Sequence, residues 1–302
     1  MKRQFVTLDV FTDKKLAGNP LAVVLDAQGL DTAQMQAIAR EFNLSETVFV
    51  LAPDNPAHSA KLRIFTPGAE LPFAGHPTVG AAVLLAVRKV ASPETEQDAI
   101  IVLEENIGAV RVGVRLRPGK APFAEFDLPA LSENIGKAPG RDRLCTALEL
   151  THGEIGFENH KPSLWSAGMR FVFVPVRDLE TVAKVKLNLA VWNDCLKGYC
   201  GEVFVYCRES VHQGNHFHGR MFAPGIGVLE DAATGAAAAA FSGVIQHFDD
   251  LPAGIHRFHV EQGYEMGRPS RIDIEIETAN GKVHAARVGG HAVFVSEGVL
   301  EI

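Results

Sequence analysis

One carboxylate in the sequence has neighbours that suit proton transfer. Glu46 stands between Leu44 and the apolar run Val48-Phe49-Val50, so a strand that begins here would bury its side chain. Burial raises the pKa of a carboxylic acid toward the range that suits a general base. A solvated glutamate at the start of a strand is the structural alternative. We expect Glu46 to be the residue that moves protons.

Two other polar residues stand before segments that read as helices. His76 is followed by Pro77, a residue favoured in the first helical turn, and Asp231 comes shortly before an alanine-rich run. His76 could cap a helix, lie in the core or transfer protons. Asp231 could take part in the reaction or only interact favourably with the helix dipole. Each residue alone is more often structural than catalytic.

The sequence contains one turn motif twice. Arg63-Ile-Phe-Thr-Pro-Gly68 and Arg220-Met-Phe-Ala-Pro-Gly225 share the pattern Arg-x-Phe-x-Pro-Gly. In each copy a glutamate and then a glycine follow, five positions apart: Glu70 with Gly75, and Glu230 with Gly235. Chance similarity is the alternative, but several features recur in the same order. A repeat of this length indicates a duplicated domain and not a solenoid.

An apolar helix is predicted after each motif. The runs Val79–Val87 and Ala236–Phe241 have almost no polar residues, which is typical of helices buried on every side. Two such helices starting at one cleft would offer free N–H groups and positive dipole ends that bind a carboxylate or phosphate and stabilise enolate-like charge. Gly75 and Gly235 would let a ligand approach the backbone, or would merely let the helices pack.

Identical letters suggest how the two halves align. Val48-Phe49-Val50 has its counterpart in Val203-Phe204-Val205. That alignment places Gly201 where the first half has Glu46. We therefore expect only the first half to carry an acid at this place, as functional groups often break the symmetry of a duplicated domain.

Composition excludes several classes of protein. The chain has 302 residues, 47% of them hydrophobic, and a net charge of −7 without a run of Lys or Arg. Nucleic acid and anionic membranes are therefore not expected as partners. The longest apolar runs are too short to span a bilayer, and acidic residues interrupt any signal-peptide core. Four cysteines without CxxC spacing favour a reducing compartment, so we expect a cytoplasmic protein.

No cofactor or metal motif stands out. The sequence lacks a phosphate-binding loop, a dinucleotide glycine fingerprint and a nucleophile elbow. His212, His216 and His218 invite a metal interpretation, but no carboxylate stands at a matching spacing and Arg220 would share their strand face. We expect neither a cofactor nor a metal.

Local patterns also predict the elements and their grouping. We expect a helix over 31–43, another through 187–196, a linker at 118–122 and a hairpin at 288–298. The predicted halves are 1–118, completed by 288–302, and 119–287.

Stretches along the whole chain are similar to one known family. They are Asp9-Val-Phe-Thr12, Leu16-Ala-Gly-Asn-Pro20, Leu44-Ser-Glu-Thr47, Phe65-Thr-Pro67, Glu70-Leu-Pro-Phe-Ala-Gly-His-Pro77, Phe222-Ala-Pro224, Glu230-Asp-Ala-Ala-Thr-Gly235, Gly267-Arg-Pro-Ser270 and Gly289-Gly290. Together they resemble the phenazine-biosynthesis F-type isomerases, which share the diaminopimelate-epimerase-like fold.

The resemblance implies an α+β protein of two pseudo-symmetric halves, each a curved, mostly antiparallel sheet around a buried helix. It also implies a homodimeric, cofactor-free isomerase that acts on a small carboxylate such as trans-2,3-dihydro-3-hydroxyanthranilate. Glu46 would remove a proton from carbon and return it elsewhere, with His76 and Asp231 assisting. The implied substrate contacts are backbone amides near Gly75 and Gly235, with Asn19, Thr234 and Ala236.

The sequence departs from the family pattern at the second helix. Ala232 replaces a common proline, and Ala236 replaces a serine that the family associates with the active site. Cysteine-dependent racemases of the same fold have thiols at positions that correspond to Ala74 and Thr234, so a two-cysteine mechanism is not expected. An epimerase or dehydratase for another acid stays an alternative, as does a metabolite-binding protein without catalysis, which Ala236 favours.

Overall fold

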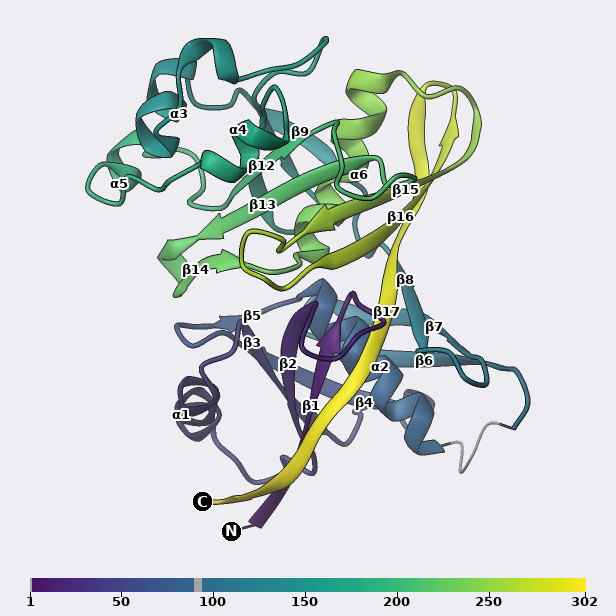
Figure 1. Cartoon of the computed structure of the whole chain (residues 1–302). Coiled ribbons are helices and arrows are strands. Elements are labelled where there is room, and N and C mark those ends of the chain that lie inside the picture. Colours follow the sequence, from purple (N-terminus) through teal and green to yellow (C-terminus); the bar gives the residue numbers. More distant parts are fainter. Residues whose placement is uncertain (1, 90–93) are drawn as a thin grey trace.

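The computed structural model describes residues 2–89 and 94–302. Two halves are stacked, with helix α2 (Gly75–Lys89) in one and α6 (Gly235–Asp249) in the other (Figure 1). The N-terminus and C-terminus lie side by side at the base of the lower half (Figure 1).

The first half contains two helices among short strands. Its elements are β1 (Lys2–Val10), β2 (Asn19–Val24), α1 (Thr32–Phe42), β3 (Glu46–Leu51), β4 (Ala60–Phe65), β5 (Glu70–Leu71), α2, β6 (Gln97–Glu105) and β7 (Gly108–Leu116). The predicted helix over 31–43 is confirmed. The side chain of Asp31 caps its first turn, and Asn43 ends it in the left-handed conformation.

The remaining elements follow the turn after β7. They are β8 (Phe123–Asp127), β9 (Glu133–Gly136), α3 (Arg141–Leu148), η1 (His152–Glu154), β10 (Ser163–Ser166), β11 (Arg170–Pro175), α4 (Leu179–Lys184), α5 (Trp192–Cys195), β12 (Val203–Cys207), β13 (Phe217–Ala223), η2 (Pro224–Ile226), β14 (Val228–Asp231), α6, β15 (Gly254–Gln262), β16 (Ser270–Ala279) and β17 (Lys282–Glu301).

The helix predicted through 187–196 is wrong over most of its length. Only α5 is helical there. The backbone N–H groups of Lys186 and Asn188 donate to the carbonyl groups of Leu148 and Ala147 in the last turn of α3. The segment therefore satisfies the free carbonyl groups at the end of α3 instead of forming its own first turn.

Strand pairing confirms the duplication. In the first half β2 runs parallel to β3, β3 antiparallel to β4 and β4 parallel to β6. In the second half β11, β12, β13 and β15 repeat these directions in the same order. The motif arginine also forms the same ion pair in both copies, Arg63 with Glu70 at 2.6 and 2.8 Å and Arg220 with Glu230 at 2.7 and 2.9 Å.

Both central helices are buried, as predicted. Every residue from Gly75 to Leu84 of α2 and from Gly235 to Gln246 of α6 is buried. Sheet strands surround them, which explains why these helices tolerate apolar residues on all faces. Within the described ranges, no helix combines the length and the apolar character needed to cross a membrane.

Strand β17 joins the two halves. It is one strand of 20 residues, so the hairpin predicted at 288–298 is wrong. Its first part pairs with β16 and its last part with β1, and Figure 1 shows it running from the upper to the lower half. A Cβ at Gly289 would lie 2.7 Å from the carbonyl oxygen of Ala124. The glycine pair therefore permits a close crossing of strands instead of a turn.

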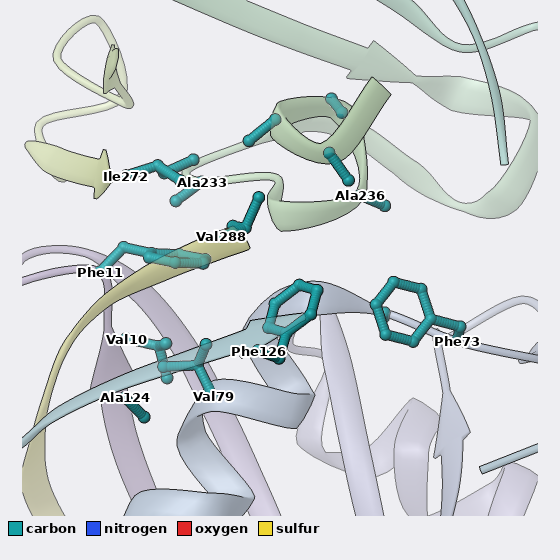
Figure 2. Close-up of a cluster of buried hydrophobic side chains, with 14 of the residues drawn as sticks. Val10, Phe11, Phe73, Val79, Ala124, Phe126, Ala233, Ala236, Ile272 and Val288 are labelled. Atoms are coloured by element: carbon teal, nitrogen blue, oxygen red, sulfur yellow. The ribbon is translucent and has the colours of Figure 1, made fainter. Parts of the chain in front are cut away.

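Apolar side chains fill the space around this crossing. Figure 2 shows Phe11 and Val288 between the halves and Phe126 near Phe73. The rings of Phe73 and Phe126 meet edge to face at 5.5 Å. β8, which carries Phe126, pairs with both β7 and β17. The division into 1–118 with 288–302 and 119–287 stays a prediction, and the pairing places β8 beside the strands of the first part.

The hydrogen-bonded register gives a different alignment of the two halves from the one based on identical letters. In the first half Thr47 of β3 faces Phe65 of β4, and in the second half Val203 of β12 faces Phe222 of β13. Phe65 and Phe222 occupy the same position of the repeated motif. Thr47 and Val203 are therefore structurally equivalent.

It follows that Glu46 corresponds to Glu202 and not to Gly201. The prediction that only the first half carries an acid at this place is wrong. Matching Val-Phe-Val shifted the alignment by one residue, and a shift of one residue in a strand exchanges its two faces. Both halves carry a glutamate at the start of the equivalent strand.

Candidate active site

A pocket lies between the two halves, at the N-termini of α2 and α6. Its open space is about 430 Å³ when the solvent at its mouth is included, and its cavity volume is about 30 Å³. Its wall consists of Glu46, Leu71, Ala74, Gly75, His76, Met169, Phe171, Glu202, Met221, Ile226, Val228, Asp231, Thr234, Gly235 and Ala236. The described residues of this wall include three carboxylates and no Lys or Arg.

Glu46 occupies the first position of β3, where parallel pairing sets it opposite Leu21 of β2. Its side chain is buried, and Oε2 has no hydrogen-bond partner among the described residues. Burial raises the pKa of Glu46 well above its ordinary value, and the nearby Asp231 raises that pKa further. The carboxylate of Glu46 therefore has a higher proton affinity than an exposed glutamate, as a general base requires.

His76 lies in the first turn of α2 and is 2% exposed. Its Nδ1 lies 3.2 Å from Oε2 of Glu46 and 3.3 Å from Nδ2 of Asn19. Burial lowers the pKa of His76 to about 3, so the imidazole is neutral. Its Nε2 is buried and has no hydrogen-bond partner in the described structure. A neutral imidazole thus lies within contact distance of the Glu46 carboxyl group.

Asp231 ends β14 and is fixed by the loop that leads into α6. It accepts hydrogen bonds from Oγ1 of Thr234 at 2.6 Å and from Nδ2 of Asn19 at 2.7 Å. The amide of Gln262 clamps this loop, because its Oε1 accepts from the backbone of Thr234 and its Nε2 donates to the carbonyl of Asp231. Burial raises the pKa of Asp231, although the hydrogen bonds from Thr234 and Asn19 oppose the increase.

Asn19 connects the first half to the second. Besides Asp231, its Nδ2 donates to the carbonyl oxygen of Ala233 at 2.8 Å. The sequence predicts that Asn19 contacts the substrate. In the structure Asn19 is fully buried and does not belong to the described wall of the pocket. It lies against His76 and Asp231 instead, and so it fixes the positions of these two side chains.

The two helix-start glycines touch each other. A Cβ on Gly75 would lie 2.7 Å from Cα of Gly235, and a Cβ on Gly235 would lie 2.8 Å from Cα of Gly75. The packing explanation for these glycines is therefore correct, whereas their contact with a ligand stays a prediction. Ala236 faces the pocket in the next position of α6.

The structure brings Glu46, His76 and Asp231 together, and it adds two residues that sequence reasoning missed. Glu202 lies on the pocket wall, and Gln262 holds the loop before α6. Only the pairing register of β12 could have revealed Glu202. Gln262 precedes a glycine at the end of a strand, a pattern that carries no chemical signal.

Of His212, His216 and His218, only His218 lies on β13. Nδ1 of His218 lies 2.9 Å from Glu261 and Nε2 lies 3.0 Å from Glu265. Burial lowers the pKa of His218, but these two hydrogen bonds outweigh it and raise the pKa to about 9. Sequence spacing could not indicate these two carboxylates, because Glu261 belongs to β15 and Glu265 to the loop after it. Among the described residues, no group of three or more His, Cys, Asp or Glu could hold a metal.

Comparisons with known proteins agree with this geometry. An uncharacterised isomerase of Mesorhizobium japonicum is 52% identical, over 99% of both chains. The trans-2,3-dihydro-3-hydroxyanthranilate isomerase of Pseudomonas aeruginosa is 35% identical, over 98% of both chains. The crystal structure of a PhzF-family phenazine biosynthesis protein from Bacillus anthracis has a TM-score of 0.88 at 26% identity and full coverage of both chains.

More distant structures show the fold alone. A hydroxyproline epimerase from Agrobacterium vitis has a TM-score of 0.64 at 11% identity, over 99% of this chain and 92% of its own. The fold is thus the α+β, diaminopimelate-epimerase-like fold. The model of the family described as phenazine biosynthesis-like protein (PhzC-PhzF) matches residues 8–298. The chain therefore belongs to the PhzC-PhzF family of phenazine biosynthesis-like proteins.

Proposed function

We propose that this protein is an isomerase that moves a proton between two carbon atoms of a small carboxylate. The observation that carries the proposal is the buried carboxyl group of Glu46, set 3.2 Å from a neutral histidine in a pocket between two helix N-termini. The names of the relatives support it, since they are called isomerases and include trans-2,3-dihydro-3-hydroxyanthranilate isomerase.

The helix N-termini suit the charge of such a substrate. The first N–H groups of α2 and α6 have no partner within their helix, and both positive dipole ends point at the pocket. These groups would hold the substrate carboxylate and stabilise the enolate-like charge that develops when a neighbouring carbon loses its proton. The wall contains no described Lys or Arg that could do so.

Glu46 would act first as base and then as acid. Its ionised form takes a proton from carbon, and the electron pair of the broken C–H bond delocalises toward the substrate carboxylate. The carboxylic acid then gives a proton to a second carbon. His76 and Asp231 orient Glu46 and keep its proton affinity high, since one contacts it at 3.2 Å and the other raises its pKa.

The rest of the pocket wall indicates what kind of group the substrate carries away from its carboxylate. Met169, Phe171, Met221 and Val228 form an apolar surface that suits a flat, unsaturated carbon skeleton. Ala236 offers a methyl group where the family pattern has a serine. We therefore expect the substrate to be similar to dihydrohydroxyanthranilate but without a polar group that needs this hydroxyl.

Proton NMR in deuterated water tests the proposal. The protein is incubated with trans-2,3-dihydro-3-hydroxyanthranilate and with a panel of small unsaturated or amino carboxylates. We expect deuterium at one defined carbon with the wild type, and loss of turnover by a factor of at least about 100 in Glu46→Gln, the scale of one general acid–base group. Glu297→Gln, an exposed residue of β17, is the matched control and should keep full activity.

Other outcomes point elsewhere. Retained activity in a folded Glu46→Gln variant would remove Glu46 from the base role. Inversion at the labelled carbon would indicate an epimerase, and loss of water a dehydratase. Thermal stabilisation by a ligand without any exchange would indicate a binding protein, because a ligand that binds only the native state raises its stability.

A further inference from the structure

Glu202 is the structural counterpart of Glu46. Both stand immediately before the strand residues Thr47 and Val203, which face the same phenylalanine of the repeated motif in each half. Residues at equivalent places in two halves that face each other approach a shared pocket from opposite halves. Glu46 and Glu202 both line this pocket.

The surroundings of Glu202 keep its carboxyl group available. It forms no ion pair with any cation in the described part of the chain, and it faces a wall that is apolar at Met169 and Phe171. Burial raises the pKa of Glu202, while the backbone around Gly201 and the thiol of Cys200 lower it. Glu202 is half-buried and Glu46 is buried.

Two carboxyl groups that line one pocket can divide one reaction between them. A proton taken by one residue and returned by the other requires that one starts ionised and the other protonated. A purely structural role would require a partner for the carboxylate, such as the arginine that binds Glu230 in β14. Among the described residues Glu202 has no ionic partner, and its hydrogen bonds come from the backbone around Gly201 and the thiol of Cys200.

We propose that Glu202 is a second proton-transfer residue, which exchanges a proton with the substrate carbon that Glu46 does not serve. The inference rests on the proposed isomerase function. In one direction the Glu46 carboxylate takes a proton as the C–H bond breaks, and the electron pair stays on the substrate. The Glu202 carboxylic acid then releases its proton to the second carbon. Solvent restores both residues, and the roles exchange in the reverse reaction.

Separate measurements of exchange and turnover test this role. The wild type, Glu202→Gln, Glu46→Gln and the exposed control Glu297→Gln are incubated in deuterated water with the substrate found by the panel, and separately with its product. We expect Glu202→Gln to exchange the substrate hydrogen within about threefold of wild type while product formation falls by about 100-fold. Glu46→Gln should show the converse, with exchange only at the new C–H bond of the product. Glu202→Asp, which keeps the carboxyl group, should regain part of the turnover.

The results separate this inference from the proposed function. Product formation by Glu202→Gln within about threefold of wild type overturns the role of Glu202 and leaves Glu46 as the single shuttle. Equal loss of exchange and turnover in folded Glu202→Gln and Glu202→Asp also overturns it, because Glu202 would then serve the same step as Glu46. A wild type that exchanges no member of the panel overturns both proposals.

Discussion

Glu105, a buried residue of the first half, has Gln262 as its counterpart in the second half. The parallel pairs β4–β6 and β13–β15 share one register, in which Leu103 corresponds to Val260 and Glu105 to Gln262. Both side chains are buried beside the start of a central helix. A glutamine is thus compatible with the backbone geometry at this place, and Glu105→Gln exchanges a titratable group for an amide of the same shape.

Burial favours the protonated form of Glu105, and its hydrogen bond with Thr78 opposes this effect. Oγ1 of Thr78 lies 2.7 Å from Oε1 of Glu105 and 2.8 Å from the carbonyl oxygen of Ala74. The Thr78 hydroxyl has one hydrogen, which the two acceptor oxygens share. Burial raises the pKa of Glu105 from 4.5 to about 8, although the contact with Thr78 lowers it.

This increase destabilises the folded state at alkaline pH. Between pH 4.5 and about 8 the folded protein binds more protons at Glu105 than the unfolded chain does. The free energy of unfolding therefore falls as the pH rises through this window. A tenfold change in proton affinity corresponds to about 1.4 kcal/mol, so the loss is about 3 kcal/mol at pH 7 and about 5 kcal/mol above pH 8.

Urea unfolding at pH 5, 7 and 8.5 measures this effect. Glu105→Gln should match the wild type at pH 5 and should exceed its free energy of unfolding by an amount that grows with pH to about 5 kcal/mol. The exposed Glu297→Gln should follow the wild type throughout. A difference between Glu105→Gln and wild type that does not change with pH would refute the reasoning, because a packing effect does not depend on protonation.

Two further changes concern the pocket. Burial and the nearby Asp231 raise the pKa of Glu46, so kcat/KM should rise with pH as Glu46 ionises. Asp231→Asn should move this rise to lower pH. A pH–rate profile in which the rise does not move would contradict the coupling between the two carboxyl groups. Gly75→Ala puts a Cβ 2.7 Å from the backbone of Gly235 and should lower the free energy of unfolding by about 1–3 kcal/mol. Gly153→Ala, which meets no atom within 4 Å, is its control in the same denaturation experiment.

The sequence indicated the main architecture because its strongest patterns were local and repeated. The helices after each motif could be predicted from apolar residues on every face, and α1 from its Asp31 cap and its final Asn43. The helix predicted over 187–196 was wrong because this segment buries its apolar residues without forming a continuous helix. Its backbone N–H groups bond to the end of α3 instead of to the segment itself. Hydrogen bonds to a distant helix such as α3 cannot be predicted from the local sequence pattern.

The errors near the site have a similar origin. Glu46, His76 and Asp231 carry chemical groups that stand out in the sequence, and the structure gathers them in one pocket. Glu202 escaped notice because identical letters were aligned in place of hydrogen-bonded pairs. The Gly289-Gly290 pair suggested a turn, but its backbone does not have the positive φ of a turn glycine, and its small size serves a crossing of strands.

The pairing of β1 with β17 sets the order in which the protein can be completed during synthesis. Lys2 lies opposite Glu301, so β1 finds its second neighbour only in β17, which is synthesised after every other described strand. Until then β1 is bonded to β2 alone and has an open edge, which is a hazard for aggregation. The half that is synthesised first is therefore the half whose sheet is completed last, because β1 must wait for β17.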